Sequence, residues 1–192
     1  MARESAPALV PPGRLPVWEL EERVVFPYAF STLALPIPEG KALLEAAHAN
    51  GDLLALFPVP RGPRKPASGI GVVALLLRVS PGSGGQGMVL VQGVVRALLT
   101  AGRRGPLRWA QVKALPDVAE PSAGITSAAL RRSVLDRLDQ LSGTSRGLPS
   151  DVRDFLGSVE DPGRFSDLVA AQLDVPFDGA LRMLQVRDVV QR

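Results

Sequence analysis

The sequence contains no cysteine and only one histidine, His48. Without cysteine the chain can form no disulfide and no thiolate metal site, and it has no cysteine nucleophile. A single histidine also excludes a metal site built from several histidines of one chain. The side chains on which most metalloenzymes and cysteine hydrolases depend are therefore missing, and we expect neither a metal nor a cofactor.

Long hydrophobic runs are also missing. No stretch approaches the roughly 18 consecutive apolar residues of a membrane-spanning helix, and no apolar signal-peptide core follows Arg3 and Glu4. The chain nevertheless has 192 residues, of which 46% are hydrophobic and 21% charged, which is enough to build a globular core. We expect a cytoplasmic protein that does not associate with membranes, with one domain or two small ones.

Acidic residues are absent from the middle of the sequence, between Asp52 and Asp117. Basic residues there could bind an anion or a nucleic acid. Alternatively, their charge could be offset by acidic residues from other parts of the chain. We favour the second interpretation because the basic residues are spread over several segments. They are Arg61, Arg64, Lys65, Arg78, Arg96, Arg103, Arg104, Arg108 and Lys113.

In the first half of the chain, segments that contain proline and glycine separate short apolar segments, which is typical of β-structure. Residues 1–13 contain three prolines and no periodicity, which predicts a flexible arm. One helix is expected at about 39–48, ending at Asn50-Gly51. The glycine-rich segment 80–87 predicts a hairpin connection, because it lacks the Lys-Ser/Thr of a phosphate-binding loop and lies between strands. The expected strands are 15–20, 30–37, 53–57, 70–79, 88–99 and 107–115.

After Pro116 the apolar spacing changes from two to about 3.6 residues, which predicts helices. One helix covers 126–141, a second begins near Pro149, and a third has Asp161 as its N-cap and Pro162 as its first residue. Segments 177–184 and 186–192 are also expected to be helical. Phe155 and Phe165 fit the apolar stripes of their helices, which predicts that both are buried. The fold class is α+β, with a β-rich module at 14–118 and a helical module at 119–192.

Catalytic motifs are missing as well. The sequence has no G-x-x-x-x-G-K-[ST] loop, and its few lysines, Lys41, Lys65 and Lys113, lie away from any recognisable catalytic serine motif. We interpret His48 as a cation at a helix end rather than as a general base. The sequence therefore predicts a protein that is not an enzyme.

Short motifs occur in a distinctive order. The first half contains Leu-Pro-x-x-x-Leu at 15–20, Val-x-x-Pro at 24–27, Ile-Gly-Val-Val-Ala at 70–74 and Val-x-Gly-x-x-Arg-Ala at 91–97. In the second half, Leu148-Pro149 is followed by Asp161-Pro162-Gly163-Arg164, which opens a helix with Ala170-Ala171 near its end. Together these motifs resemble the amino-terminal, substrate-recognising domain of ATP-dependent Lon proteases, which is also found as a separate LON-domain protein.

The resemblance implies a PUA-like β pseudobarrel that holds one helix, followed by a helical bundle whose last segment begins a linker helix. It also implies noncatalytic binding of unfolded, damaged or degron-bearing polypeptides for the ATPase and protease domains of Lon. The chain should be a monomer in isolation and part of a hexamer in a full Lon, where six copies add avidity. Two departures from the family, Glu21-Glu22-Arg23 and the basic segment 58–68, bear on substrate preference.

Three aromatic residues near the start of the β-module, Trp18, Tyr28 and Phe30, are the candidate substrate-binding residues. An exposed aromatic patch would suit the capture of apolar segments, although burial at the junction of the two modules is equally compatible with the sequence. The alternative functions are a stand-alone adaptor that binds another protein and a nucleic-acid-binding module. Contacts to an anion or nucleic acid would come from Arg61, Arg64, Lys65, Arg103 and Arg104.

Overall fold

The fold is described from a computed structural model, which covers residues 13–62, 68–82, 84–101, 107–118, 123–141, 144 and 147–192. The predicted arm at residues 1–12 lies outside these ranges. The strands are β1 (Arg14–Glu21), β2 (Phe30–Pro36), β3 (Leu53–Val59), β4 (Ser68–Pro81), β5 (Gln86–Ala101) and β6 (Trp109–Ala114). The helices are α1 (Ile37–His48), α2 (Ala123–Gln140), α3 (Ser150–Ser158), α4 (Pro162–Gln172) and α5 (Phe177–Gln185).

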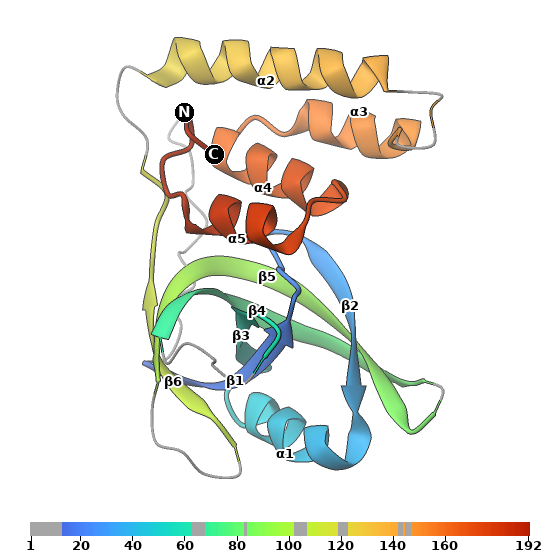
Figure 1. The fold of residues 1–192 in the computed structure, drawn as a ribbon, viewed down its shortest axis with the longest axis vertical. Helices are drawn as coiled ribbons and strands as arrows, with labels where there is room; N and C mark the ends of the chain where they lie inside the picture. Colours follow the sequence, from blue (N-terminus) through green and yellow to red (C-terminus); the bar gives the residue numbers. More distant parts are fainter. Residues whose placement is uncertain are drawn as a thin grey trace, which may run out of the picture.

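The strands form a sheet that closes into a ring (Figure 1). Strand β1 pairs in parallel with β3 and antiparallel with β6, and β5 closes the ring through its pairing with β6. Strand β5 is long enough to serve two partners, because residues 97–101 pair with β6 while residues 86–92 pair with β2. Strand β2 therefore lies at an edge of the sheet. The α+β fold with one helix in the β-rich part is confirmed.

The core of the β-module lies inside the ring. Strand β3 is buried along its whole length, as its uninterrupted apolar sequence predicts. Helix α1 lies at one end of the ring (Figure 1), where Leu43 and Ala47 pack against residues of β1 to β5. The predicted hairpin connection is also present, and Gly84 and Gly85 there both have the positive φ that suits a tight turn.

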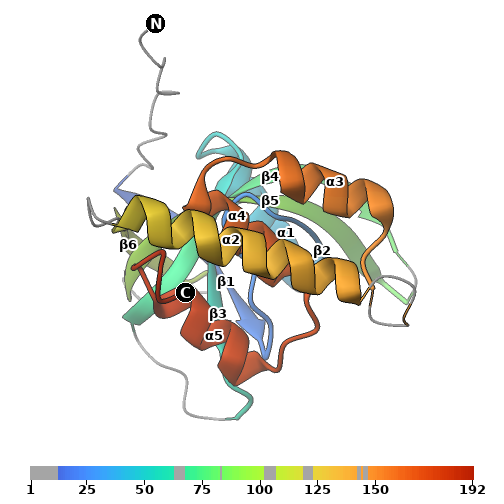
Figure 2. The same ribbon diagram turned by 90° about the horizontal axis from the view of Figure 1, so that it is seen from above.

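The four later helices lie on the opposite side of the ring from α1, and α2 is the outermost (Figure 1). Seen from above, α2 crosses over α4, with α3 and α5 on either side (Figure 2). Helices α4 and α5 meet the sheet through Ala170, Ala180 and Leu184, which pack with Phe26 and Val72. Helix α4 begins as predicted, because the Asp161 carboxylate accepts the N–H of Arg164 at 2.7 Å. The boundary between modules at residue 118 remains a prediction.

The prediction that Phe155 belongs to the core is wrong, because its side chain is 48% exposed. Helix α3 has only nine residues, and it turns Leu156 into the bundle, where that side chain is 1% exposed. Neighbouring positions on a helix are about 100° apart, so the face that carries Phe155 points to solvent. Phe165, the other aromatic residue of this prediction, is buried as expected.

The predicted helix at 186–192 is also wrong. The segment forms an isolated bridge with Val118 and then turns. Val118 donates its N–H to the carbonyl of Arg187 at 2.9 Å, and the Asp188 carboxylate accepts the N–H of Val190 at 2.8 Å. A seven-residue helix has little stability of its own. The bonds to Val118 and to the Asp188 side chain outweigh it, and residues 186–192 are not helical. The linker helix remains a prediction.

Candidate functional site

A cluster of four charged side chains joins the sheet to the helices. Arg96 of β5 and Asp167 of α4 are buried, and they form a two-pronged ion pair in which Arg96 Nη1 donates to Asp167 Oδ2 at 2.7 Å. The Arg192 side chain is also buried, and it pairs with Asp167 Oδ1 at 3.2 Å and with Asp117 Oδ2 at 3.0 Å. Burial raises the pKa of Asp167, while Arg96 and Arg192 oppose the rise. The two cations and two anions of the cluster balance each other in charge. Their ion pairs hold β5, α4, the segment after β6 and the segment after α5 together.

The segment between β1 and β2 is fixed against β5 at Gly93. Tyr28 donates its N–H to the Gly93 carbonyl at 2.7 Å, and the Gly93 N–H donates to the Ala29 carbonyl at 2.9 Å. A Cβ atom on residue 93 would collide with the carbonyl of Phe26. These contacts explain two residues of the Val-x-Gly-x-x-Arg-Ala motif. Gly93 leaves room for the chain that crosses β5, and Arg96 bonds Asp167 of α4 and the Leu184 carbonyl of α5.

Tyr28 is held at the junction with its ring half exposed. Its φ is +64°, which is unusual for a residue other than glycine. The guanidinium of Arg164, in the first turn of α4, lies 5.7 Å from the ring centroid. Burial raises the pKa of the Tyr28 phenol, and Asp161 and Asp117 raise it further while Arg164 lowers it. The ring therefore lies at the surface against the first turn of α4.

The three predicted aromatic residues do not share one surface. Phe30 begins β2 and is 64% exposed, two residues from Tyr28, which is 39% exposed. Trp18 lies on β1, is partly buried and packs against the interior cluster that includes Leu43 of α1. Tyr28 thus comes two residues before the first residue of β2, Phe30, and both are exposed, whereas Trp18 packs toward the interior.

A groove of about 360 Å³ lies at the junction beside the start of β2. On its β-side Arg23 donates from Nη2 to the carbonyl of Thr32 at 3.0 Å. The sequence predicted binding at this junction but not the helical wall, which lies far along the chain from the β-side and is brought to it only by folding. The groove is lined by Glu22, Arg23, Val24, Phe26, Ser31, Ala170, Ala171, Leu173, Asp174, Val175, Phe177 and Ala180.

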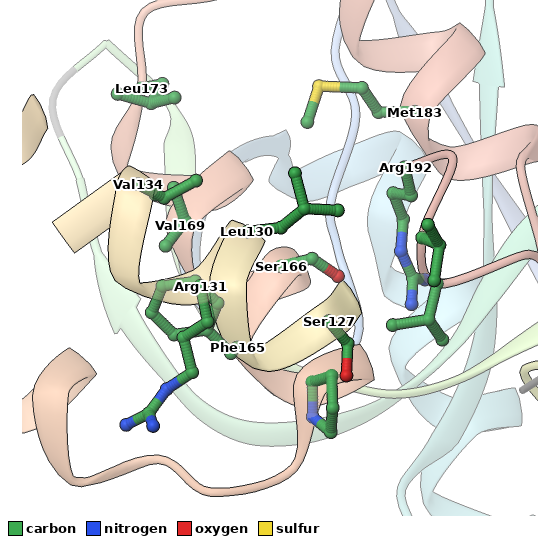
Figure 3. Close-up of a pocket in the computed structure, with 13 residues that line it drawn as sticks. Ser127, Leu130, Arg131, Val134, Phe165, Ser166, Val169, Leu173, Met183 and Arg192 are labelled. Atoms are coloured by element: carbon green, nitrogen blue, oxygen red, sulfur yellow. The ribbon is translucent and has the colours of Figure 1, made fainter. Parts of the chain in front are cut away.

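A second cavity, of about 230 Å³, lies beneath α2 and is mostly apolar (Figure 3). In this view Leu173 lies at the upper left and Met183 at the upper right, while Phe165 and Ser127 lie below them. Leu173 also lines the junction groove. The sequence does not predict this cavity, although Leu130, on the apolar stripe of α2, is one of its lining residues. Its lining consists of Ser127, Leu130, Arg131, Val134, Pro162, Phe165, Ser166, Val169, Leu173, Met183, Val189, Val190 and Arg192.

Several basic residues of the acid-free stretch have acidic partners from outside it. Arg61 pairs with Glu22 at 3.1 Å, and Arg108 pairs with Glu19 while its guanidinium lies 5.4 Å from the centroid of Phe57. Arg96 is in the buried cluster. The charge of these three residues is offset as the second interpretation expects. Arg64, Lys65, Arg103 and Arg104 lie outside the described residues.

His48 ends α1, where its Nδ1 contacts Oδ1 of Asp52 on the surface. Within the described ranges, no three His, Asp or Glu side chains are grouped closely enough to hold a metal ion. Among the helices in the part of the chain that the structure describes, none combines the length and apolar character needed to cross a membrane.

Comparison with known sequences gives one family over almost the whole chain. The model of the ATP-dependent protease La (LON) substrate-binding domain matches residues 14–192. The Lon protease of Citrifermentans bemidjiense is 30% identical over 186 residues, which cover 94% of this chain and 23% of that protein. The Lon protease of Chloroflexus aurantiacus is 30% identical over 187 residues, or 93% of this chain and 22% of that one. The chain thus spans less than a quarter of the length of these relatives.

Solved structures share the fold. The N-terminal domain of Mycobacterium avium complex Lon protease superposes with a TM-score of 0.75 at 24% identity, covering 93% of this chain and 92% of that one. A Lon N-terminal domain protein from Xanthomonas campestris gives a TM-score of 0.61 at 17% identity, covering 92% of both chains. The order of motifs, the ring with its single helix and the family match agree, and the chain belongs to the Lon substrate-binding domain family.

Proposed function

We propose that this chain binds unfolded or degron-bearing polypeptides as the noncatalytic recognition part of an ATP-dependent Lon protease. The family match over residues 14–192 carries this proposal. The exposed aromatic residues of the junction support it, because unfolded chains differ from folded ones mainly in the apolar side chains that they expose.

The surface that we assign to substrate comprises Tyr28, Phe30 and the junction groove. Phe30 offers an exposed ring, and the Tyr28 ring is kept in place by Arg164 and by the bonds at Gly93. The groove adds carboxylates, a guanidinium and apolar side chains from α4 and α5. A single surface of this size binds weakly, and a ring of copies would supply the avidity.

Crosslinking tests this assignment. The 192-residue chain is crosslinked to denatured casein and the labelled residues are identified by mass spectrometry. We expect labels around Phe30 and the junction groove, and a clear loss of crosslinking in Phe30→Ser. The matched control is Leu98→Ser, because Leu98 is another exposed apolar residue but lies on the half of β5 that pairs with β6.

Three results would contradict the assignment. An equal loss of crosslinking in Phe30→Ser and Leu98→Ser would show that any exposed apolar side chain contributes to capture. Labels confined to Arg61 and the basic segments, with capture abolished by added salt, would favour the nucleic-acid-binding alternative, since phosphate contacts weaken steeply with salt. Capture of a folded protein in preference to denatured casein would instead favour the adaptor.

A further inference from the structure

The outer edge of β2 has no strand partner among the described residues. Strand β2 is last in the order of the sheet and pairs only with β5. In an antiparallel pair, alternate residues direct both their N–H and C=O groups toward the partner strand, and the residues between them direct theirs away. Half of the backbone groups of β2 therefore point away from the sheet.

Two hydrogen bonds show which residues these are. The Gly93 N–H donates to the carbonyl of Ala29, and the unshifted register that follows places the odd-numbered residues of β2 toward β5. Tyr28, which also bonds Gly93, lies before the strand and outside this alternation. The carbonyl of Thr32 accepts a bond from the Arg23 side chain instead, so the even-numbered residues point outward. Phe30, Thr32 and Ala34 thus present their backbone groups to the outer edge, and their side chains are exposed as well.

This edge lacks the usual protection against pairing. Natural edge strands are commonly blocked by charged side chains, by a bulge or by proline. The sequence of β2 is FSTLALP, which contains no charged residue and has proline only at its last position. The pairing of β2 with β5 has no register shift from Phe30 to Pro36, whereas the pairing of β4 with β5 has two. The irregular pairing of Tyr28 and Ala29 with Gly93 lies before the strand begins. Among the described residues, the one side chain that bonds an outward backbone group of β2 is Arg23, through the Thr32 carbonyl.

We propose that an extended segment of a polypeptide substrate adds to the sheet as a strand beside β2, bound through the outward N–H and C=O groups of Phe30, Thr32 and Ala34. Ser31 of the same strand lines the junction groove, as does Arg23, which bonds the Thr32 carbonyl, so the edge adjoins the groove. Backbone pairing suits a partner that is defined by being unfolded, because every extended segment offers the same donors and acceptors. This inference rests on the proposed function and specifies how the same surface recognises its substrate.

The first test uses a defined probe, a fluorescein-labelled nonapeptide of alternating valine and threonine with a lysine at each end. Its binding to the 192-residue chain is followed by fluorescence anisotropy. A second peptide of the same sequence carries N-methyl groups on two adjacent central residues, which block hydrogen bonding along both of its edges. We expect the methylated peptide to bind about tenfold more weakly or not at all. Equal affinity of the two peptides would overturn the inference.

The second test changes the protein. Thr32→Pro removes an outward N–H and leaves the pairing with β5 intact, and proline is tolerated on an edge strand. Thr32→Val changes the side chain but keeps the N–H. We expect about tenfold weaker binding in T32P and nearly unchanged binding in T32V, with circular dichroism confirming that both fold. Arg23→Ala frees the Thr32 carbonyl and should tighten binding about two- to fivefold.

The outcomes separate this inference from the proposed function. If neither the peptide nor denatured casein binds the unchanged protein, the proposed function fails. If both bind but T32P and T32V behave alike, recognition is through side chains and only the strand-addition inference fails. If T32P abolishes self-association seen by light scattering and leaves peptide binding unchanged, the edge pairs with a second copy of the chain and the inference is wrong.

Discussion

Gly93 lies where the chain between β1 and β2 crosses β5, and there is no room for a side chain at this position. A Cβ atom would collide with the carbonyl of Phe26 and lie within 3.1 Å of Pro27 Cα, so the backbone would have to move. The same crossing sets the positions of Tyr28 and Phe30. At the scale of single residues, the candidate surface therefore depends on a glycine that itself binds nothing.

We expect Gly93→Ala to destabilise the fold by about 1–3 kcal/mol, the usual cost of overpacking. Gly157→Ala is the matched control, since Gly157 lies within α3 and a Cβ there meets nothing within 4 Å. It should stabilise the protein by about 0.5–1 kcal/mol through helix propensity. Urea unfolding measures both changes in the free energy of unfolding. If Gly93→Ala leaves that free energy unchanged, the crossing is not tightly packed.

Tyr28 is the single tyrosine of the sequence, so its ionisation can be followed directly by absorbance at 295 nm. We expect the midpoint to lie above 10.0 in the folded protein and to return to about 10.0 in denaturant, because burial and nearby carboxylates raise the pKa of Tyr28. Because the folded state holds the phenol proton more tightly, Tyr28 contributes to the free energy of unfolding below pH 10.0. This contribution is lost as the pH rises from 10.0 toward the pKa of the folded protein. Asp161→Asn should lower the pKa of Tyr28, and Arg164→Ala should raise it. A rise in Asp161→Asn or a fall in Arg164→Ala would contradict these assignments.

At the scale of elements, the buried charge cluster ties β5, α4, the segment after β6 and the segment after α5 together. Removing the carboxylate of Asp167 leaves Arg96 buried without its main partner, and such a loss typically costs about 3–5 kcal/mol. Asp139→Ala is the control, because its ion pair with Arg153 is on the surface, where such pairs contribute about 0–1 kcal/mol. Similar unfolding midpoints for Asp167→Ala and Asp139→Ala would show that the cluster does not hold these elements.

The elements that the sequence predicted well are those whose signals are local. The strands and α1 are bounded by turn residues such as Asn50-Gly51, and α4 begins at the Asp161 cap because a cap is a contact over three residues. The segment 186–192 was mispredicted because its partner, Val118, is about 70 positions away. The junction groove was missed in part for the same reason, since its two walls meet only after folding.

At the scale of the whole molecule, the large exposed apolar side chains are distributed over separate elements. Leu77 and Leu98 lie on β4 and β5, Leu130 on α2 and Phe155 on α3. A stable dimer usually buries about 800 Å² on each partner. We expect the 192-residue chain to be mainly monomeric at micromolar concentration. Multi-angle light scattering measures this, and a stable hexamer would mean that assembly contacts lie within this domain.

The binding of an unfolded polypeptide tests the central claim most directly. The 192-residue chain is titrated into fluorescein-labelled α-lactalbumin, once native and once reduced and carboxymethylated, at low salt and at high salt. We expect binding to the unfolded form only, surviving at high salt because apolar contacts and backbone hydrogen bonds carry it, and weakened by Phe30→Ser but not by Leu98→Ser. Equal binding of the native and unfolded forms, or binding that disappears at high salt, would contradict the account.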